Sequence, residues 1–144
     1  MDLLFLCIGN PEGGDDSVGP FIANLLKKEK INVIDGQTYP ENFTGKIKNL
    51  NPENLIIIDA IDMNLEPGEI RIVPKEKIGL MTISTHGIPI SLLINYLQND
   101  IKNIKLIGIQ PKKMTGKISE NVKKSALKLI DLIIKKDFEK LEKI

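Results

Sequence analysis

Short apolar runs rich in β-branched residues alternate with longer amphipathic segments along most of this chain. Four runs have the length and composition of buried parallel strands, and a glycine, an aspartate or a glutamine follows each: residues 3–8, 33–34, 55–58 and 104–109. Apolar residues recur at spacings of three and four within residues 18–25, 90–97 and 118–133, which predicts three helices. This alternation predicts a three-layer α/β/α fold with a mainly parallel sheet of about five strands.

The predicted organisation is simple. A Pro67-Gly68 turn precedes residues 69–73 and 78–83, which are expected to form an extra edge hairpin or ribbon. No internal repeat or linker interrupts the sequence, so residues 1–144 are predicted to form a single domain. The lysine-rich segment 135–143 is expected to be a solvated helix tail that frays.

Charge and hydropathy exclude several classes of protein. The 20 basic and 19 acidic side chains leave a formal charge of +1, which argues against a nucleic-acid or anionic-membrane partner. The longest apolar runs are far shorter than the roughly 20 residues needed to span a bilayer, and Asp2 stands where a signal peptide would be basic. The sequence therefore predicts a cytoplasmic protein. Its one cysteine, Cys7, excludes an internal disulfide and a cysteine-rich zinc site.

Acidic residues and the only histidine follow the predicted strands. Asp15 and Asp16 end a glycine-rich loop after the first strand, whereas Asp59 and Asp62 follow the third. His86 precedes the helix expected to begin near Pro89. Because ligands of open α/β sheets bind outside the carboxyl ends of the strands, these side chains are expected on one rim.

The glycine-rich loop 9–19 does not have the spacing of a phosphate-binding loop. Asp15 and Asp16 would also repel a phosphate there, since both carry negative charge at the helix entry. Adjacent side chains point in different directions. We therefore expect one aspartate to cap the first helix, which is expected to begin near Ser17, and the other to face the cleft.

Two carboxylates and one imidazole predict a metal site with open positions. A carboxylate at Asp59 is costly to bury unless it is paired, hydrogen-bonded or bound to metal. A helix N-terminus beside His86 keeps its ring neutral, which is the metal-binding form. Two carboxylate oxygen ligands and one imidazole nitrogen ligand suit nickel or zinc. An aspartic dyad of Asp16 and Asp59 is the alternative, whereas Cys7 is expected in the core and no G-x-S-x-G elbow is present.

Several blocks, in consistent order, together resemble one family. They are GNPEGGDDSVGP (9–20), DG (35–36), LIIIDAIDM (55–63), PGEIRI (67–72), THGIP (85–89) and GIQP (108–111). Together they are similar to the [NiFe]-hydrogenase maturation endopeptidases, most of all to the hydrogenase-3 type. Two positions depart from that pattern: Gln37 and Ser17 stand where the family often has glycine. Both lie beside the expected cleft and bear on substrate fit more than on metal ligation.

The resemblance implies a protease that removes a C-terminal peptide from the hydrogenase large-subunit precursor after nickel insertion. It assigns catalysis and metal binding to Asp16, Asp59 and His86. Because the ligands of one ion must lie close together, we expect these three residues within about 7 Å of one another and Asp15 pointing elsewhere. The nickel is expected to arrive with the substrate as a recognition mark, although zinc or another divalent metal could bind in isolation. Water activated by metal or carboxylate attacks the peptide bond, with Asp62 orienting a ligand.

Two other functions stay open from the sequence. A non-enzymatic nickel-binding accessory protein would use the same three ligands without cutting a peptide bond. A peptidyl-tRNA hydrolase shares the G-N-P turn after the first strand, but it needs a histidine close behind that turn and a basic face for tRNA. No histidine precedes His86, and the net charge is only +1.

Overall fold

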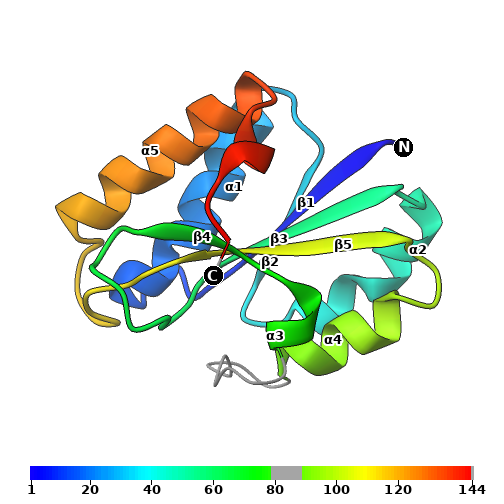
Figure 1. Cartoon of the computed structure of the whole chain (residues 1–144), viewed down its shortest axis with the longest axis horizontal. Coiled ribbons are helices and arrows are strands. Elements are labelled where there is room, and N and C mark those ends of the chain that lie inside the picture. The colour runs from blue at the N-terminus through cyan, green and yellow to red at the C-terminus, as the bar shows by residue number, and fades with distance from the viewer. Residues whose placement is uncertain (79–88, 144) are drawn as a thin grey trace.

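A five-stranded sheet with the strand order β2-β1-β3-β5-β4 forms the centre of the molecule. The computed structural model describes residues 1–78 and 89–143. Four strands are parallel: β1 (Leu3–Ile8), β2 (Val33–Gln37), β3 (Asn54–Ala60) and β5 (Asn103–Ile109). The edge strand β4 (Ile70–Val73) runs antiparallel to β5 (Figure 1). The predicted mainly parallel sheet is therefore confirmed.

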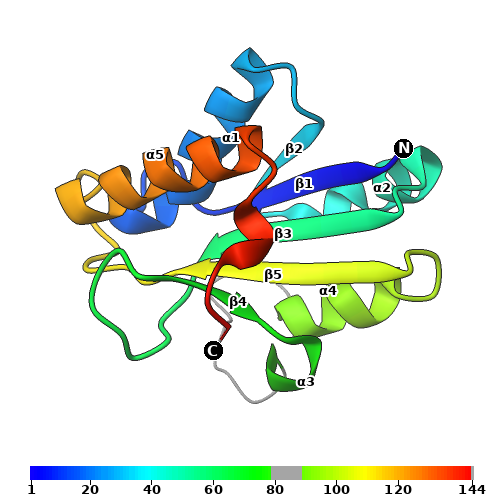
Figure 2. The same cartoon turned by 45° about the horizontal axis from the view of Figure 1, so that its top comes forward.

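Helices cover both faces of the sheet, as Figure 2 shows. One face carries α1 (Val18–Lys28) and α5 (Glu120–Ile134), and the other carries α2 (Thr44–Leu50), α3 (Lys75–Ile78) and α4 (Ile90–Leu97). Three short 3-10 turns complete the described elements: η1 (Gly14–Ser17), η2 (Pro40–Phe43) and η3 (Phe138–Lys140). Ser17 immediately precedes α1, so the predicted start of that helix is confirmed, and α5, preceded by Ser119, begins within the predicted range 118–133.

Alternation along the strands divides the core into two layers. In β1, Leu4 and Leu6 pack into the layer under α2 and α4, whereas Phe5 and Cys7 pack into the layer under α1 and α5. All four side chains are at most 1% exposed. Burial on both faces explains why the parallel strands appear in the sequence as continuous apolar runs.

One local prediction was wrong, and another is confirmed in part. Residues 70–73 of the expected edge hairpin form the edge strand β4, which pairs with β5, whereas Ile78 ends helix α3. Residues 79–83 lie outside the described residues, so their part of the hairpin stays a prediction. The C-terminal segment does not fray as a helix tail. Phe138 packs edge-on against Phe5 with ring centroids 5.8 Å apart, and the carbonyl of Glu142 accepts a 2.8 Å hydrogen bond from the Ile72 N–H. Burial of an aromatic ring and pairing along β4 stabilise this end of the chain.

Helix α2 was not predicted. Only Ile47 of its seven residues is buried, so the apolar pattern that identifies an amphipathic helix is almost absent. None of the helices in the described ranges is both long and apolar enough to span a membrane.

Candidate active site

Three parallel strands bring the chemically interesting loops to one edge of the sheet. Register pairs Cys7 of β1 with Ile58 of β3, and Asp59 of β3 with Gly108 of β5. The glycine-rich loop after β1, the acidic segment after β3 and the segment after β5 therefore begin side by side. This is the carboxyl edge at which open α/β sheets bind ligands.

Asp59 is a fully buried carboxylate that lacks the partners such a group normally has. Its exposed fraction is 0%, and neither oxygen accepts a well-formed hydrogen bond from the described residues. Burial raises the pKa of Asp59 well above its usual range, the nearby charge of Asp16 raises it further, and the backbone N–H of Ala60 offsets the rise only in part. A carboxylate held in this way is poised to share a proton or to bind a cation.

Asp16 lies close enough to Asp59 for its charge to act on that carboxylate. It is 4% exposed, and its Oδ2 accepts a 2.8 Å hydrogen bond from the backbone N–H of Asn10. Two glycines bring this loop back onto the end of β1: a Cβ on Gly9 would collide with the backbone oxygen of Asp16, and one on Gly19 with that of Ile8. The glycines thus allow the loop to pack tightly against the end of β1.

Asp15 points away from this pair and is fully hydrogen-bonded. Its Oδ2 accepts the backbone N–H groups of Lys112 and Lys113 at 2.8 and 3.0 Å and the Ser119 hydroxyl at 2.8 Å. Its Oδ1 accepts the Ser119 backbone N–H at 2.6 Å. Burial opposes the charge, but these four hydrogen bonds outweigh it and lower the pKa of Asp15.

The expectation that one of the two aspartates caps the first helix was wrong. Ser17 occupies the N-cap position of α1, and its side chain makes no capping hydrogen bond. The 3-10 turn Gly14–Ser17 turns Asp15 toward the loop after β5, where its carboxylate binds Ser119, the residue preceding α5. Asp15 therefore fastens the loop 112–119 to the glycine-rich loop.

Gln110 is a site residue that the sequence analysis did not single out. Its side chain is 6% exposed, and its Oε1 accepts the backbone N–H groups of Met63 and Leu65 at 2.7 and 3.2 Å. Its Nε2 donates to Oδ1 of Asp62 at 3.1 Å. The sequence signal that could have identified Gln110 was its position, directly after a predicted strand and within the GIQP block. Gln110 holds the segment that follows Asp59.

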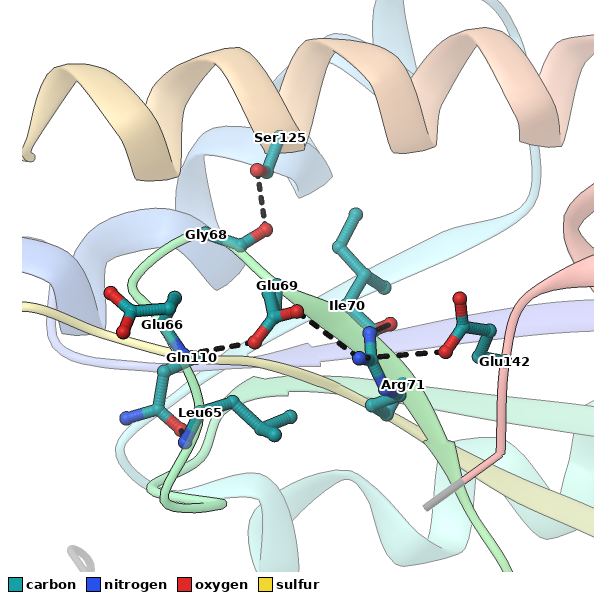
Figure 3. A network of polar contacts seen from close by, with 9 residues as sticks. All are labelled: Leu65, Glu66, Gly68, Glu69, Ile70, Arg71, Gln110, Ser125 and Glu142. Atoms are coloured by element: carbon teal, nitrogen blue, oxygen red, sulfur yellow. Dashed lines mark hydrogen bonds and ion pairs between the residues drawn. The ribbon is translucent and has the colours of Figure 1, made fainter.

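Asp62 orders its own loop. Its Oδ1 accepts hydrogen bonds from the Gln110 amide and the Asn64 N–H. Both hydrogen bonds lower the pKa of Asp62, and the one from Gln110 has the larger effect. Downstream, Figure 3 shows Glu69 joined to the Glu66 N–H and to Arg71, which also pairs with Glu142. The segment between β3 and β4 is therefore fixed by side chains as well as by the sheet.

The third predicted ligand, His86, lies outside the described residues, so its distance to the two aspartates stays a prediction. Within the described part of the chain, no three His, Cys, Asp or Glu side chains are grouped so that they could hold a metal ion. Cys7 is buried in β1, and burial raises the pKa of its thiol, so it is a core residue as expected.

The departure at Gln37 has a backbone consequence. Gln37 adopts a positive φ of 49°, a conformation that favours glycine, at the end of β2. Its carbonyl accepts the Gly9 N–H at 2.8 Å, and its side chain accepts the Tyr39 hydroxyl at 3.0 Å. The residue that stands in place of a glycine thus contacts the loop that carries the two aspartates.

Comparison with known proteins gives consistent matches. Residues 20–136 match the family model described as hydrogenase maturation protease. The chain is 43% identical over 115 residues to the hydrogenase 3 maturation protease of Escherichia coli K12, which covers 77% of this chain and 74% of that protein. The solution structure of the endopeptidase HycI from Escherichia coli has a TM-score of 0.84 at 36% identity, covering 91% and 88% of the two chains. The crystal structure of the [NiFe] hydrogenase maturation protease HycI from Thermococcus kodakarensis has a TM-score of 0.83 at 30% identity, covering 96% and 92%.

Proposed function

This chain belongs to the hydrogenase maturation protease family, whose members are endopeptidases that process the C-terminus of the hydrogenase large subunit, and from that premise we propose how its site recognises the substrate. The substrate is the large-subunit precursor of a [NiFe] hydrogenase in the cytoplasm. Asp16 and Asp59, together with His86, contact the nickel ion that this precursor already carries. The nickel is thus part of the substrate and marks the precursor as ready for cleavage.

The buried carboxylate of Asp59 is the observation that carries this proposal. Both of its oxygens lack well-formed hydrogen bonds from the described residues, and Asp16 lies beside it at the carboxyl edge of the sheet. A fold retains two close, buried acids only at a cost, because like charges repel and burial penalises the charged form of each. An incoming divalent cation would supply positive charge that both carboxylates can bind.

The donor set suits this cation. Carboxylate oxygens and a neutral imidazole are ligands for borderline divalent metals such as nickel and zinc. When the nickel-bearing precursor docks, the metal supplies positive charge that the two carboxylates and His86 recognise. The same contacts hold the peptide bond in one place, which converts binding energy into orientation.

Hydrolysis then requires an activated water molecule. Among the described residues at this edge, the Asp16–Asp59 pair offers the carboxylate base, and the raised pKa of Asp59 is the property expected of a group that accepts or shares a proton. Asp15 and Asp62 are engaged in hydrogen bonds that fix their own loops. They are therefore assigned to the scaffold of the site and not to the chemistry.

A cleavage assay with purified components tests the proposal. Wild-type protein is mixed with nickel-loaded and nickel-free precursor, and the shortened large subunit is measured by mass spectrometry. We expect cleavage of the nickel-loaded precursor only. Equal cleavage of both forms would refute nickel recognition and favour an aspartic dyad, whereas binding without cleavage would favour the accessory-protein alternative.

A further inference from the structure

A second feature near the site is an apolar groove between η2, α2 and α4. The groove has a volume of about 340 Å³ and is lined by Glu41, Thr44, Leu92, Leu93 and Tyr96. Leu93 is 2% exposed and forms the floor, while Leu92 and Tyr96 are 55% and 52% exposed and form an open wall. Large apolar side chains that open to solvent around one hollow are typical of a binding surface.

Glu41 places a carboxylate in this apolar surrounding. Its Oε2 is buried, and no described residue donates a hydrogen bond to it. The neighbouring Thr44 hydroxyl donates to the backbone carbonyl of Glu41 at 3.1 Å and not to the carboxylate. A buried carboxylate oxygen without a donor is unfavourable in the free protein, because it has lost water and gained nothing in return.

A lysine that contacts the groove wall is engaged in other interactions. Lys48 forms a 3.3 Å ion pair with Asp100, and its ammonium group lies 3.7 Å from the centroid of the Tyr96 ring. No described lysine or arginine forms an ion pair with Glu41. Lys48 therefore supports the aromatic wall, and the negative charge of Glu41 is left for a partner from outside.

The groove begins at the same edge of the sheet as the proposed active site. Turn η2 follows β2, whose last residue, Gln37, accepts the backbone N–H of Gly9 in the glycine-rich loop. Helix α4 begins at Ile90, four residues after His86 in the sequence. The wall from η2 therefore starts close to the loop that carries Asp16, and the wall from α4 starts close to His86 in the sequence.

We propose that this groove binds one lysine or arginine side chain of the precursor protein. The long apolar stem of such a side chain would lie against Leu92 and Tyr96, and its cationic head would donate to Oε2 of Glu41. This inference rests on the proposed function, since it takes the precursor as the occupant. It adds a charge-selective contact that is separate from the two carboxylates assigned to nickel.

The test measures binding and cleavage separately. Calorimetry gives the Kd of nickel-loaded precursor, and initial rates give KM and kcat, for wild type, Glu41→Gln and the control Glu53→Gln. Glu53 is exposed and immediately precedes β3, at the opposite edge of the sheet. Because hydrogen bonds to charged groups are strong, Glu41→Gln should raise Kd and KM about tenfold with kcat unchanged. Glu53→Gln should behave as wild type.

A second variant guards against loss of fold. Leu92→Lys places a competing cation on an exposed position of the same wall, so it should weaken precursor binding to a similar extent without unfolding the protein. On the precursor, lysines and arginines are replaced by methionine one at a time. One replacement should weaken binding to wild type about tenfold and have no further effect on Glu41→Gln, as expected of a coupled pair.

The two proposals fail in different ways. An unchanged Kd for both Glu41→Gln and Leu92→Lys, with normal cleavage by wild type, would refute the groove and leave the proposed function intact. Precursor that binds wild type and is not cut would refute the proposed function, and its Kd values would still decide on the groove. Failure of wild type to bind the precursor at all would refute both.

Discussion

Two buried aspartates at the same edge of the sheet are held in opposite ways. Asp15 accepts four hydrogen bonds from Lys112, Lys113 and Ser119, and its pKa is lowered. Asp59 accepts no well-formed hydrogen bond from the described residues, and its pKa is raised. Burial is nearly complete for both, so the difference lies in their donors. A satisfied buried charge stabilises the fold, whereas an unsatisfied one is explained by a ligand or a reaction.

The largest predicted effect concerns activity at the unsatisfied aspartate. Asp59→Asn preserves size but removes the charge and the proton-accepting oxygen, so cleavage of nickel-loaded precursor should fall about 100-fold or more. The melting temperature should change little, because the substitution removes a charge that burial disfavours. Asp16→Asn should show the same separation between activity and stability.

A matched control for this variant is Asp62→Asn, which alters an exposed acid three residues away. It should lose at most a few-fold in activity, since the hydrogen bonds of the Asp62 carboxylate to described residues are those to Gln110 and Asn64 of its own surroundings. Full activity of both Asp59→Asn and Asp16→Asn would contradict the assignment of this pair to the chemistry.

The next effect concerns stability at the satisfied aspartate. Asp15→Ala leaves the backbone N–H groups of Lys112, Lys113 and Ser119 without their acceptor, and it should lower the free energy of unfolding by about 3 kcal/mol. Ser119→Ala removes only the hydroxyl donor and should lower it by about 1 kcal/mol. Urea unfolding of the two variants measures both values. Equal loss in the two would show that the Ser119 hydroxyl, and not the three backbone N–H groups, accounts for the contribution of Asp15.

The contrast between Asp15 and the Asp16–Asp59 pair shows what the sequence could predict. The parallel strands and the starts of α1 and α5 follow from apolar runs and from the serines before each helix, which are local signals. That the two adjacent acids point in different directions also follows from local geometry. The partner of Asp15 does not, because Ser119 is 104 residues away in sequence.

Features that depend on distant contacts were missed or wrong. Helix α2 buries one residue, so its position depends on packing and not on a visible apolar face. The role of Gln110 depends on Met63 and Leu65, which are 47 and 45 residues away. The C-terminal segment is ordered by Phe138 and Glu142, whose partners are Phe5 and Ile72. Composition marked that segment as solvated because lysines dominate it.

The dependence of stability on pH should have opposite signs at the two aspartates. The pKa of Asp15 is lower in the folded than in the unfolded protein, so its stabilisation is present above about pH 4 and is lost as pH falls through the folded pKa. The pKa of Asp59 is higher in the folded protein, so folding becomes less favourable as pH rises from about 4 through the folded pKa.

Unfolding free energies measured between about pH 3 and 8 separate these contributions. Asp15→Asn should flatten the acid side of the stability profile, and Asp59→Asn should flatten the decline toward neutral pH. Profiles of both variants parallel to that of wild type would show that neither carboxylate changes its proton affinity on folding.

The smallest predicted effect concerns Gln37, which lies next to the loop that carries Asp16 and is not one of the acids compared above. Gln37 adopts a positive φ of 49° beside the loop of Asp16, and a non-glycine residue in this region is disfavoured by roughly 1 kcal/mol. Gln37→Gly relieves that strain but loses the contact to the Tyr39 hydroxyl and increases the freedom of the unfolded chain. The free energy of unfolding should therefore change by less than about 1 kcal/mol.

Because the carbonyl of residue 37 still accepts the Gly9 N–H, kcat of Gln37→Gly should stay near that of wild type, and any change should appear in KM. A large fall in kcat would mean that the Gln37 side chain, and not only its backbone, positions the loop that carries Asp16.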